Sequence, residues 1–484
     1  MSHTTAKPVY AVIGAGIAGA TAAMHLAEHG ADVLLIEKGP SLVNGPPICH
    51  LHAGGNLYRE IPEDQCKELL KQSIDTVRYF PHTLNVRPTI IAVPKDDSGS
   101  AESLINRLDS VSNYYQELVD IDPKNKVLGE PEDYYQLYTK SDLTRLAKST
   151  QPLIPMTTDD WVIPFAQHVD LDNLKFPVIV VQEYGWSLFR VAASAALTLE
   201  RYPNCQIHLN TELKKVSKQE QGWHIQCTNV DGEQLSLNAD YLINACGYET
   251  GVIDDLADYP RERLVEFKAA YVTQWPSCQQ KWPEVIFHGV RGTKNGMAQL
   301  TPYPNGVFQL HGMTEDITLF NDGLVTSSVY SSQPMLPVRL KAKMDSGWTE
   351  RVAEERTDKA IRHLSRFIPE YSTAERLGKP LYGAQQIPGD NVTLRAADVS
   401  FVGEDYARME VVKGSSAVEA AKKIIERWGL RVAHQHDVHQ HDYLSNDQLT
   451  QHEVTVSLNA EQVENRAVEL AIQRNYPPEL AKVF

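Results

Sequence analysis

The sequence predicts an α/β fold, with one domain built on a buried parallel sheet plus an antiparallel meander and a second domain of mixed α/β structure. Three observations support this prediction. An apolar strand, a glycine-rich turn and an apolar helix follow one another near the start of the chain. Short alternating strands fill residues 206–244, and strands punctuated by Gly and Pro fill residues 260–350. A chain of 484 residues is long enough for two or three domains.

The first forty residues predict one compact βαβ unit. Residues 9–13 (VYAVI) are uniformly apolar, as in a strand buried on both faces. The helical pattern that follows reaches His29, and Gly30 is placed to end it. Residues 32–39 (DVLLIEKG) form the second strand. Short connections of this kind are typical of parallel strands joined by a crossover helix.

Composition narrows the class of protein. The formal net charge of −16 would repel phosphate backbones, so we expect no nucleic-acid partner. The N-terminus lacks the order of a signal peptide, and no apolar run reaches the roughly 20 residues of a membrane-spanning helix. The six cysteines have no metal-like spacing. We therefore expect a cytoplasmic protein with no transmembrane segment and no metal site.

A dinucleotide fingerprint lies between the first strand and the first helix. Gly14, Gly16 and Gly19 form G-x-G-x-x-G, in which the first glycine permits a tight turn, the second lets a pyrophosphate approach, and the third allows close helix packing. Glu37 ends the second strand, where a carboxylate accepts hydrogen bonds from ribose hydroxyls. The pattern predicts a Rossmann-like site for an ADP-containing ligand, either FAD or NAD. The predicted site also includes Ala18 and Lys38.

Later stretches favour FAD. The chain resembles FAD-dependent oxidoreductases of the D-amino-acid-oxidase branch of the glutathione-reductase-like flavoproteins, over most of residues 8–430. The family pattern T-x-V is matched by residues 211–213, and the resemblance implies that Leu213 touches the adenine. It also implies that Gly247, in the turn after LINAC, approaches the pyrophosphate.

The segment 401–429 (FVGEDYARMEVVKGSSAVEAAKKIIERWG) predicts a helix with a capping box formed by Ser416 and Glu419 and a stop at Gly429. In the resembling family the start of this helix points at the flavin, where its dipole stabilises negative charge. The resemblance places Gly403 and Asp405 close to the ribitol and phosphates. Further predicted cofactor contacts in this segment are Lys413, Gly414 and Ser415.

The stretch HLHAGGNLYR (50–59) fits the part of the family that runs along the flavin ring. Its small residues let the backbone approach, so we place His52 nearest the flavin, with Ala53 and Gly54 as N–H donors. Some relatives attach the flavin covalently through a histidine in a similar context. Whether His52 does so stays open.

The predicted reaction takes a hydride from a C–H bond next to an amine or hydroxyl of an amino acid, amine or 2-hydroxy acid. An amine substrate needs no strong protein base, whereas a hydroxy acid requires one, for which His52 and His311 are the candidates. Arg59 is a candidate clamp for a substrate carboxylate. Gln385 stands where the family has an arginine, and a neutral amide cannot replace a guanidinium. Arg190 and Arg395 are alternative clamps.

We expect an FAD-binding domain of residues 1–62, 150–258 and 376–430, a substrate domain of residues 63–149 and 259–375, and a polar C-terminal extension from residue 431. The histidine-rich run at 434–442 is interpreted as part of that extension and not as a metal site. A flavin amine oxidase-like enzyme and a non-catalytic FAD- or nucleotide-binding module are the alternatives. The substrate, the electron acceptor (oxygen, a quinone or an electron-transfer protein) and the oligomeric state stay open.

Overall fold

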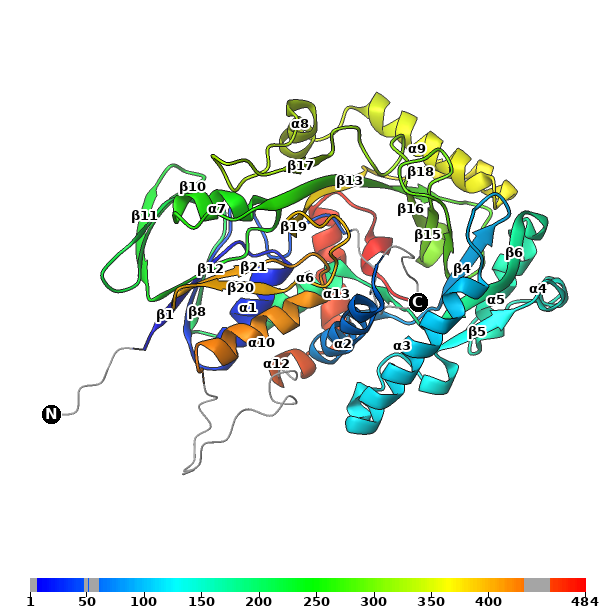
Figure 1. The fold of residues 1–484 in the computed structure, drawn as a ribbon, viewed down its shortest axis with the longest axis horizontal. Helices are drawn as coiled ribbons and strands as arrows, with labels where there is room; N and C mark the ends of the chain where they lie inside the picture. Colours follow the sequence, from blue (N-terminus) through cyan, green and yellow to red (C-terminus); the bar gives the residue numbers. More distant parts are fainter. Residues whose placement is uncertain (1–6, 48–50, 52–60, 431–452) are drawn as a thin grey trace.

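The computed structural model describes residues 7–47, 51, 61–430 and 453–484, and it contains two large sheets that lie side by side (Figure 1). The smaller sheet has six strands in the order β20-β21-β12-β1-β2-β8. Strands β20 and β21 are antiparallel, and all the other neighbours are parallel. Its strands are β1 (Val9–Ile13), β2 (Asp32–Ile36), β8 (Cys205–His208), β12 (Tyr241–Asn244), β20 (Val399–Val402) and β21 (Tyr406–Met409). The predicted Rossmann-like sheet is therefore confirmed.

Helix α1 (Ile17–Glu28) lies beside this sheet and packs against both α6 (Leu188–Leu199) and α10 (Ser416–Arg427). Gly30 and Gly429 follow α1 and α10 with φ of 77° and 63°, the left-handed backbone that ends helices at glycine, as predicted. The predicted capping box of α10 is wrong. The hydroxyl of Ser416 donates instead to Gln72 of α2 (Glu63–Tyr79), and Glu419 pairs with Lys71. Packing of α2 on α10 supplies these tertiary partners.

The meander is confirmed as an antiparallel sheet of β9 (Thr211–Lys218), β10 (Trp223–Asn229) and β11 (Gln234–Ala239). Its flanking strands β8 and β12 belong to the six-stranded sheet. The meander packs its buried side chains, including Leu213 and Ile225, against that sheet.

The larger sheet has ten strands and a long central strand, β13 (Arg263–Gln274), that pairs with four others. Residues 63–149, predicted as part of the substrate domain, contribute strands to this sheet, and TIIAVP is an apolar run with two isoleucines and a valine. β6 and β19 belong here, although we expected their residues in the FAD-binding part. The other strands are β4 (Thr89–Pro94), β5 (Tyr135–Tyr138), β6 (Leu174–Val181), β14 (Glu284–Phe287), β15 (Ala298–Tyr303), β16 (Val307–Gly312), β17 (Leu324–Thr326), β18 (Glu375–Arg376) and β19 (Leu381–Pro388).

Helices surround the larger sheet, and α9 (Glu350–Ser365) packs on β13, β15 and β16. A two-stranded ribbon, β3 (Leu84–Asn85) with β7 (Gly185–Trp186), forms a separate sheet. The remaining helices of this part are α3 (Glu102–Ile121), α4 (Lys140–Leu146), α5 (Thr158–His168) and α8 (Val338–Ser346). Helix α7 (Thr250–Leu256) instead contacts β9 of the meander and β12 of the six-stranded sheet.

A buried charge network joins the two sheets. The Asp254 carboxylate on α7 pairs with Arg263 of β13 and, at 2.6 Å, with Arg408 of β21. Asp254 and Arg263 are fully buried. Removing one member of such a network leaves a desolvated charge without compensation, so it fixes how the sheets meet.

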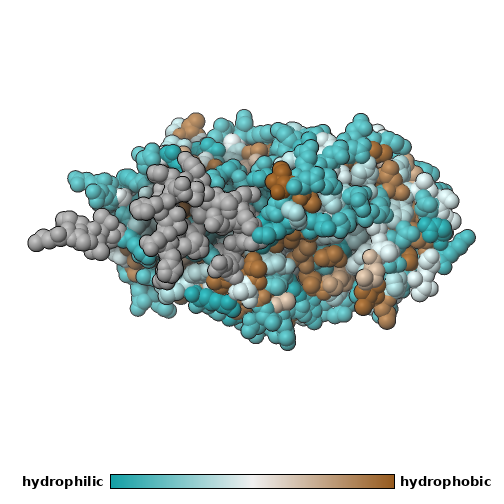
Figure 2. Space-filling view, turned by 90° about the horizontal axis from the view of Figure 1, so that it is seen from below, coloured by the Kyte–Doolittle hydropathy of each residue, from teal (hydrophilic) through white to brown (hydrophobic). Residues whose placement is uncertain are grey.

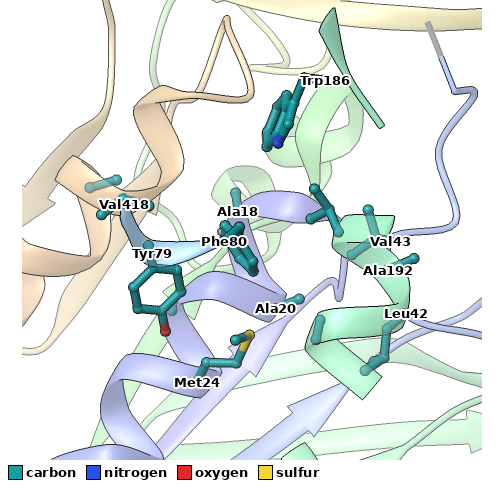
Figure 3. Close-up of a cluster of buried hydrophobic side chains, with 14 of the residues drawn as sticks. Ala18, Ala20, Met24, Leu42, Val43, Tyr79, Phe80, Trp186, Ala192 and Val418 are labelled. Carbon is teal, nitrogen blue, oxygen red and sulfur yellow. The ribbon is translucent and has the colours of Figure 1, made fainter. Parts of the chain in front are cut away.

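The described part of the C-terminal segment folds onto α6. It forms α12 (Glu453–Val456), α13 (Ala460–Gln473) and a 3₁₀ turn at Pro478–Ala481. Val463, Ala467 and Leu470 of α13 are buried in the same core cluster as α1, part of which is drawn in Figure 3. Each fully buried Val or Leu side chain contributes about 1.5–3 kcal/mol relative to exposure. The polar residues Glu461, Gln462 and Glu469 lie on the exposed face of α13.

Hydrophilic residues predominate on the face shown in Figure 2, with apolar groups in small patches between them. Among the residues that the structure describes, no helix is long and apolar enough to cross a membrane.

Candidate functional site

The glycine-rich turn lies at the carboxyl end of β1. Gly14 has φ of 91°, and a Cβ built there would come 2.6 Å from the carbonyl oxygen of Ala245. A Cβ on Gly19 would lie 1.8 Å from the carbonyl oxygen of Gly14. Only glycine fits these two positions, because the obstructing atoms are backbone. By contrast, no atom lies within 4 Å of a Cβ built on Gly16. That side of the turn is open to a ligand.

Glu37 is fixed beside this turn. Its carboxylate accepts the N–H of Ala15 and the N–H of Gly39, each at 2.6 Å. The N–H of Thr211 donates to the carbonyl of Glu37 at 2.9 Å, so β9 starts at the same edge of the sheet. Helix α1 begins at Ile17 with no side-chain cap. The open side of Gly16, the carboxylate and the uncapped helix start together fit a dinucleotide.

Four other residues that we predicted to contact the cofactor interact with the protein itself. Leu213, two residues into β9, is 8% exposed and packs in the core between meander and sheet. The ammonium of Lys38 pairs with Glu249. Ala18 is buried in the first turn of α1. The buried Ser415 accepts the hydroxyl of Thr76 on its carbonyl at 2.9 Å.

A cavity of about 330 Å³ lies between the two sheets. From the side of the six-stranded sheet it is lined by Ile17, Gly247, Lys413 and Gly414, so the structure brings three predicted cofactor residues to one place with the start of α1. Gly247 has φ of 56°. The larger sheet and its connections contribute Lys268, Met297, Gln299, His311, Met313, Gly383, Ala384, Gln385 and Gln386. The remaining lining residues are Pro46, Leu188, Tyr248, Val411 and Val412.

Gly403 and Asp405 are not part of this arrangement, which corrects the sequence prediction. They form the turn between β20 and β21 and line a separate surface groove with Pro8 and Asp240. The Asp405 carboxylate pairs with Lys218 there. Because β21 runs parallel to β12 and β1, the turn that precedes it lies at the amino ends of the strands. Ligands of parallel sheets bind at the carboxyl ends.

Four predicted residues, His52, Ala53, Gly54 and Arg59, lie outside the described residues, as does the histidine-rich run at 434–442. His311 lines the cavity, and its Nδ1 lies 3.3 Å from the side-chain nitrogen of Gln309.

Lys268 is the cavity residue that the sequence analysis missed. Its side chain is 21% exposed, its ammonium lies 2.7 Å from the Glu266 carboxylate, and it donates to the amide oxygen of Gln385 at 3.3 Å. Burial lowers the pKa of Lys268, Glu266 opposes this effect, and the charges of Arg291 and Arg395 add to the lowering. Arg291 also pairs with Glu266. Lys268 and Arg291 therefore share the Glu266 carboxylate, and the charge of Arg395 acts on the same pair.

A signal for Lys268 was present in the sequence. Glu266 and Lys268 stand two residues apart in RLVEFKAAYVTQ, so they share one face of an otherwise mostly apolar strand. Two arginines considered as clamps have structural partners. Arg190 is buried against Glu464 and donates to the carbonyl of Ala481 at 3.1 Å. Arg395 donates to the carbonyls of Val392 and Leu394, while its charge still reaches Lys268.

The comparisons with known proteins agree with this architecture. A family model described as "FAD dependent oxidoreductase" (DAO) matches residues 10–111, which include the glycine turn and Glu37. No curated protein sequence matches the chain. The structure is similar to glycine oxidase from Geobacillus kaustophilus, with a TM-score of 0.54 at 13% identity, covering 88% of this chain and 96% of that one.

Two further solved structures have the same fold. L-proline dehydrogenase from P. horikoshii has a TM-score of 0.54 at 16% identity, over 87% of this chain and 94% of that one. L-α-glycerophosphate oxidase from Mycoplasma pneumoniae, solved with FAD bound, has a TM-score of 0.54 at 14% identity, over 88% and 95% of the two chains. At these identities the likeness describes the fold.

Proposed function

We propose that this chain, an FAD-dependent oxidoreductase of the DAO family, oxidises a small amine that carries a carboxylate, such as an amino acid. The observation that most supports this substrate class is the position of Lys268, a partly buried cation in the cavity that adjoins the start of α1. The amine substrates named for glycine oxidase and L-proline dehydrogenase are consistent with it.

FAD is the cofactor, and the chain's own residues fit it. In this proposal the pyrophosphate approaches the open side of Gly16, Glu37 accepts ribose hydroxyls, and Lys413 and Gly414 lie toward the flavin end. When bound, FAD supplies the acceptor for the two electrons that leave the substrate as a hydride.

Lys268 would hold the substrate carboxylate. An ammonium donates charge-assisted hydrogen bonds, and the amide of Gln385 beside it adds a neutral contact. Lys268 belongs to the larger sheet, whereas Ile17 and Gly414 line the cavity from the other side. A carboxylate bound at Lys268 therefore directs the rest of a small molecule toward the nucleotide side, which restricts its orientation.

The oxidation breaks the C–H bond next to nitrogen. The hydride leaves the carbon, the nitrogen lone pair forms the C=N bond, and the nitrogen loses a proton to give an imine. His311 is the described cavity residue whose side chain is able to accept that proton. A 2-hydroxy acid is the second candidate substrate, because His311 could act as the base that a hydroxyl requires.

Anaerobic mixing of the FAD-loaded protein with matched amino acids, amines and 2-hydroxy acids tests this proposal. We expect amino acids to bleach the oxidised flavin absorbance and the 2-hydroxy acids to leave it unchanged. Bleaching by 2-hydroxy acids alone would favour the second candidate, and no bleaching by any class would contradict both. Air or a quinone, added afterwards, identifies which electron acceptor restores the colour.

A further inference from the structure

The loop that follows Glu37 contains a residue in an unusual backbone conformation. Val43 has φ of 48°, in the left-handed region. A β-branched side chain rarely adopts this region, because its Cβ is crowded against the backbone. Such a conformation persists where surrounding contacts impose it, and it often lies at a functional site.

One of these contacts leads directly to the glycine turn. The N–H of Val43 donates to the carbonyl oxygen of Ala15 at 2.7 Å, and Ala15 lies between Gly14 and Gly16. The Val43 side chain is 2% exposed, and Figure 3 shows it with Leu42 beside Ala192 of α6. The loop is thus attached to the turn by its backbone and to the core by its side chains.

The other contact comes from the opposite end of the chain. Arg474 follows α13, and its guanidinium donates to the carbonyls of Val43 and Leu42, both at 2.8 Å, and to the hydroxyl of Ser41 at 3.1 Å. These are three consecutive residues. The planar fork of a guanidinium is suited to holding several acceptors in a fixed arrangement. The guanidinium also lies 5.6 Å from the ring centre of Phe189 on α6.

Helix α13 is itself held in place, so it can act as a support. It packs along α6, and Arg190 of α6 pairs with Glu464 of α13. The contacts therefore run from α6 and α13 through Arg474 to Val43, and from Val43 to the carbonyl of Ala15 in the turn.

We infer that Arg474 is a positioning residue for the cofactor: it holds Val43 in the left-handed conformation and so fixes the glycine turn in the shape that receives the pyrophosphate. The inference rests on the proposed function, because it assumes that this turn binds FAD. The described C-terminal segment thus has a role in cofactor binding, although Arg474 stands 431 residues after Val43 in the sequence.

The test compares FAD affinities of apoproteins, measured by quenching of flavin fluorescence. Arg474→Met removes the guanidinium and keeps most of the apolar stem. Arg466→Met is the matched control, because Arg466 lies on α13, the helix that Arg474 follows, and pairs with the exposed Glu200 at 3.0 Å. Val43→Gly combined with Arg474→Met tests the strain, since glycine adopts positive φ without steric cost.

We expect Arg474→Met to weaken FAD binding at least about tenfold, which corresponds to about 1.4 kcal/mol. Arg466→Met should stay within about twofold of the parent, and the double variant should recover most of the loss. If Arg474→Met alone does not fold, the double variant is tested in its place, and the inference predicts that it folds and binds FAD. Equal affinities of Arg474→Met and Arg466→Met would overturn the inference, as would a double variant that binds no better than Arg474→Met. A parent protein that binds no FAD would instead overturn the proposed function.

Discussion

The ammonium of Lys268 on β13 lies 3.3 Å from the amide oxygen of Gln385 on the paired strand β19. From the resemblance to the family, we expected a carboxylate-binding arginine at the position of Gln385. The neighbouring strand therefore brings a cation to the place where the sequence alone showed a neutral amide. The proposed binding of a substrate carboxylate at Lys268 can therefore be tested by replacing this lysine.

Replacing Lys268 should impair recognition of carboxylated substrates. We expect Lys268→Met to lower kcat/KM about 10- to 100-fold, because a charge-assisted hydrogen bond contributes about 1.5–3 kcal/mol. Lys268→Arg should retain more activity, since it keeps the charge. Steady-state kinetics with an amino acid and with its decarboxylated amine check this prediction. Equal losses for both substrates would argue against carboxylate binding at Lys268.

Binding of a carboxylate should depend on pH. Burial and nearby arginines lower the pKa of Lys268, so its ammonium is lost on raising the pH through a value below the ordinary lysine pKa. We expect the affinity for a short carboxylic acid without an amine, followed by the flavin spectrum, to fall over that range. In Lys268→Arg the decline should be absent, because a guanidinium stays protonated. The same decline in both proteins would assign it to another group.

Two glycines of the fingerprint should respond differently to substitution. A side chain on Gly16 meets no protein atom within 4 Å, so Gly16→Val should fold normally and lose FAD affinity. A Cβ on Gly19 collides with backbone, so Gly19→Ala should also lower the melting temperature of the apoprotein. Thermal melts and FAD titrations of the two variants separate these effects. Unchanged FAD binding by Gly16→Val would show that the pyrophosphate does not bind at this turn.

The charge network between the sheets predicts a stability effect. Asp254→Asn leaves Arg263 and Arg408 buried without a carboxylate, so we expect a loss of about 3–5 kcal/mol in the free energy of unfolding. Asp172→Asn is the control, because Asp172 is 81% exposed in its pair with Lys140 and such pairs contribute about 0–1 kcal/mol. Denaturant unfolding measures both. Similar losses in the two variants would mean that the buried network does not stabilise the junction.

Local sequence patterns predicted the parts of the fold whose contacts are local. The strand, glycine turn and helix of residues 9–28 needed only neighbouring residues, and Gly30 and Gly429 end helices where expected. The capping box at Ser416 failed because Gln72 and Lys71, more than 340 residues away, supply better partners. Asp405 was misplaced because the direction of β21 in the sheet decides at which edge its preceding turn lies. The spacing of Glu266 and Lys268 was a local signal for a charged pair, but the place of Lys268 in the cavity depends on distant strands. The contacts of Arg474 with residues 41–43 also join distant segments, which no local pattern contains.

The most direct test of the central claim compares one amino acid with the amine that lacks only its carboxylate, each mixed anaerobically with the FAD-loaded protein. The account predicts that the amino acid bleaches the flavin at least about tenfold faster, because Lys268 orients only the carboxylated molecule. Equal rates for the pair, or a protein that takes up no FAD, would contradict it.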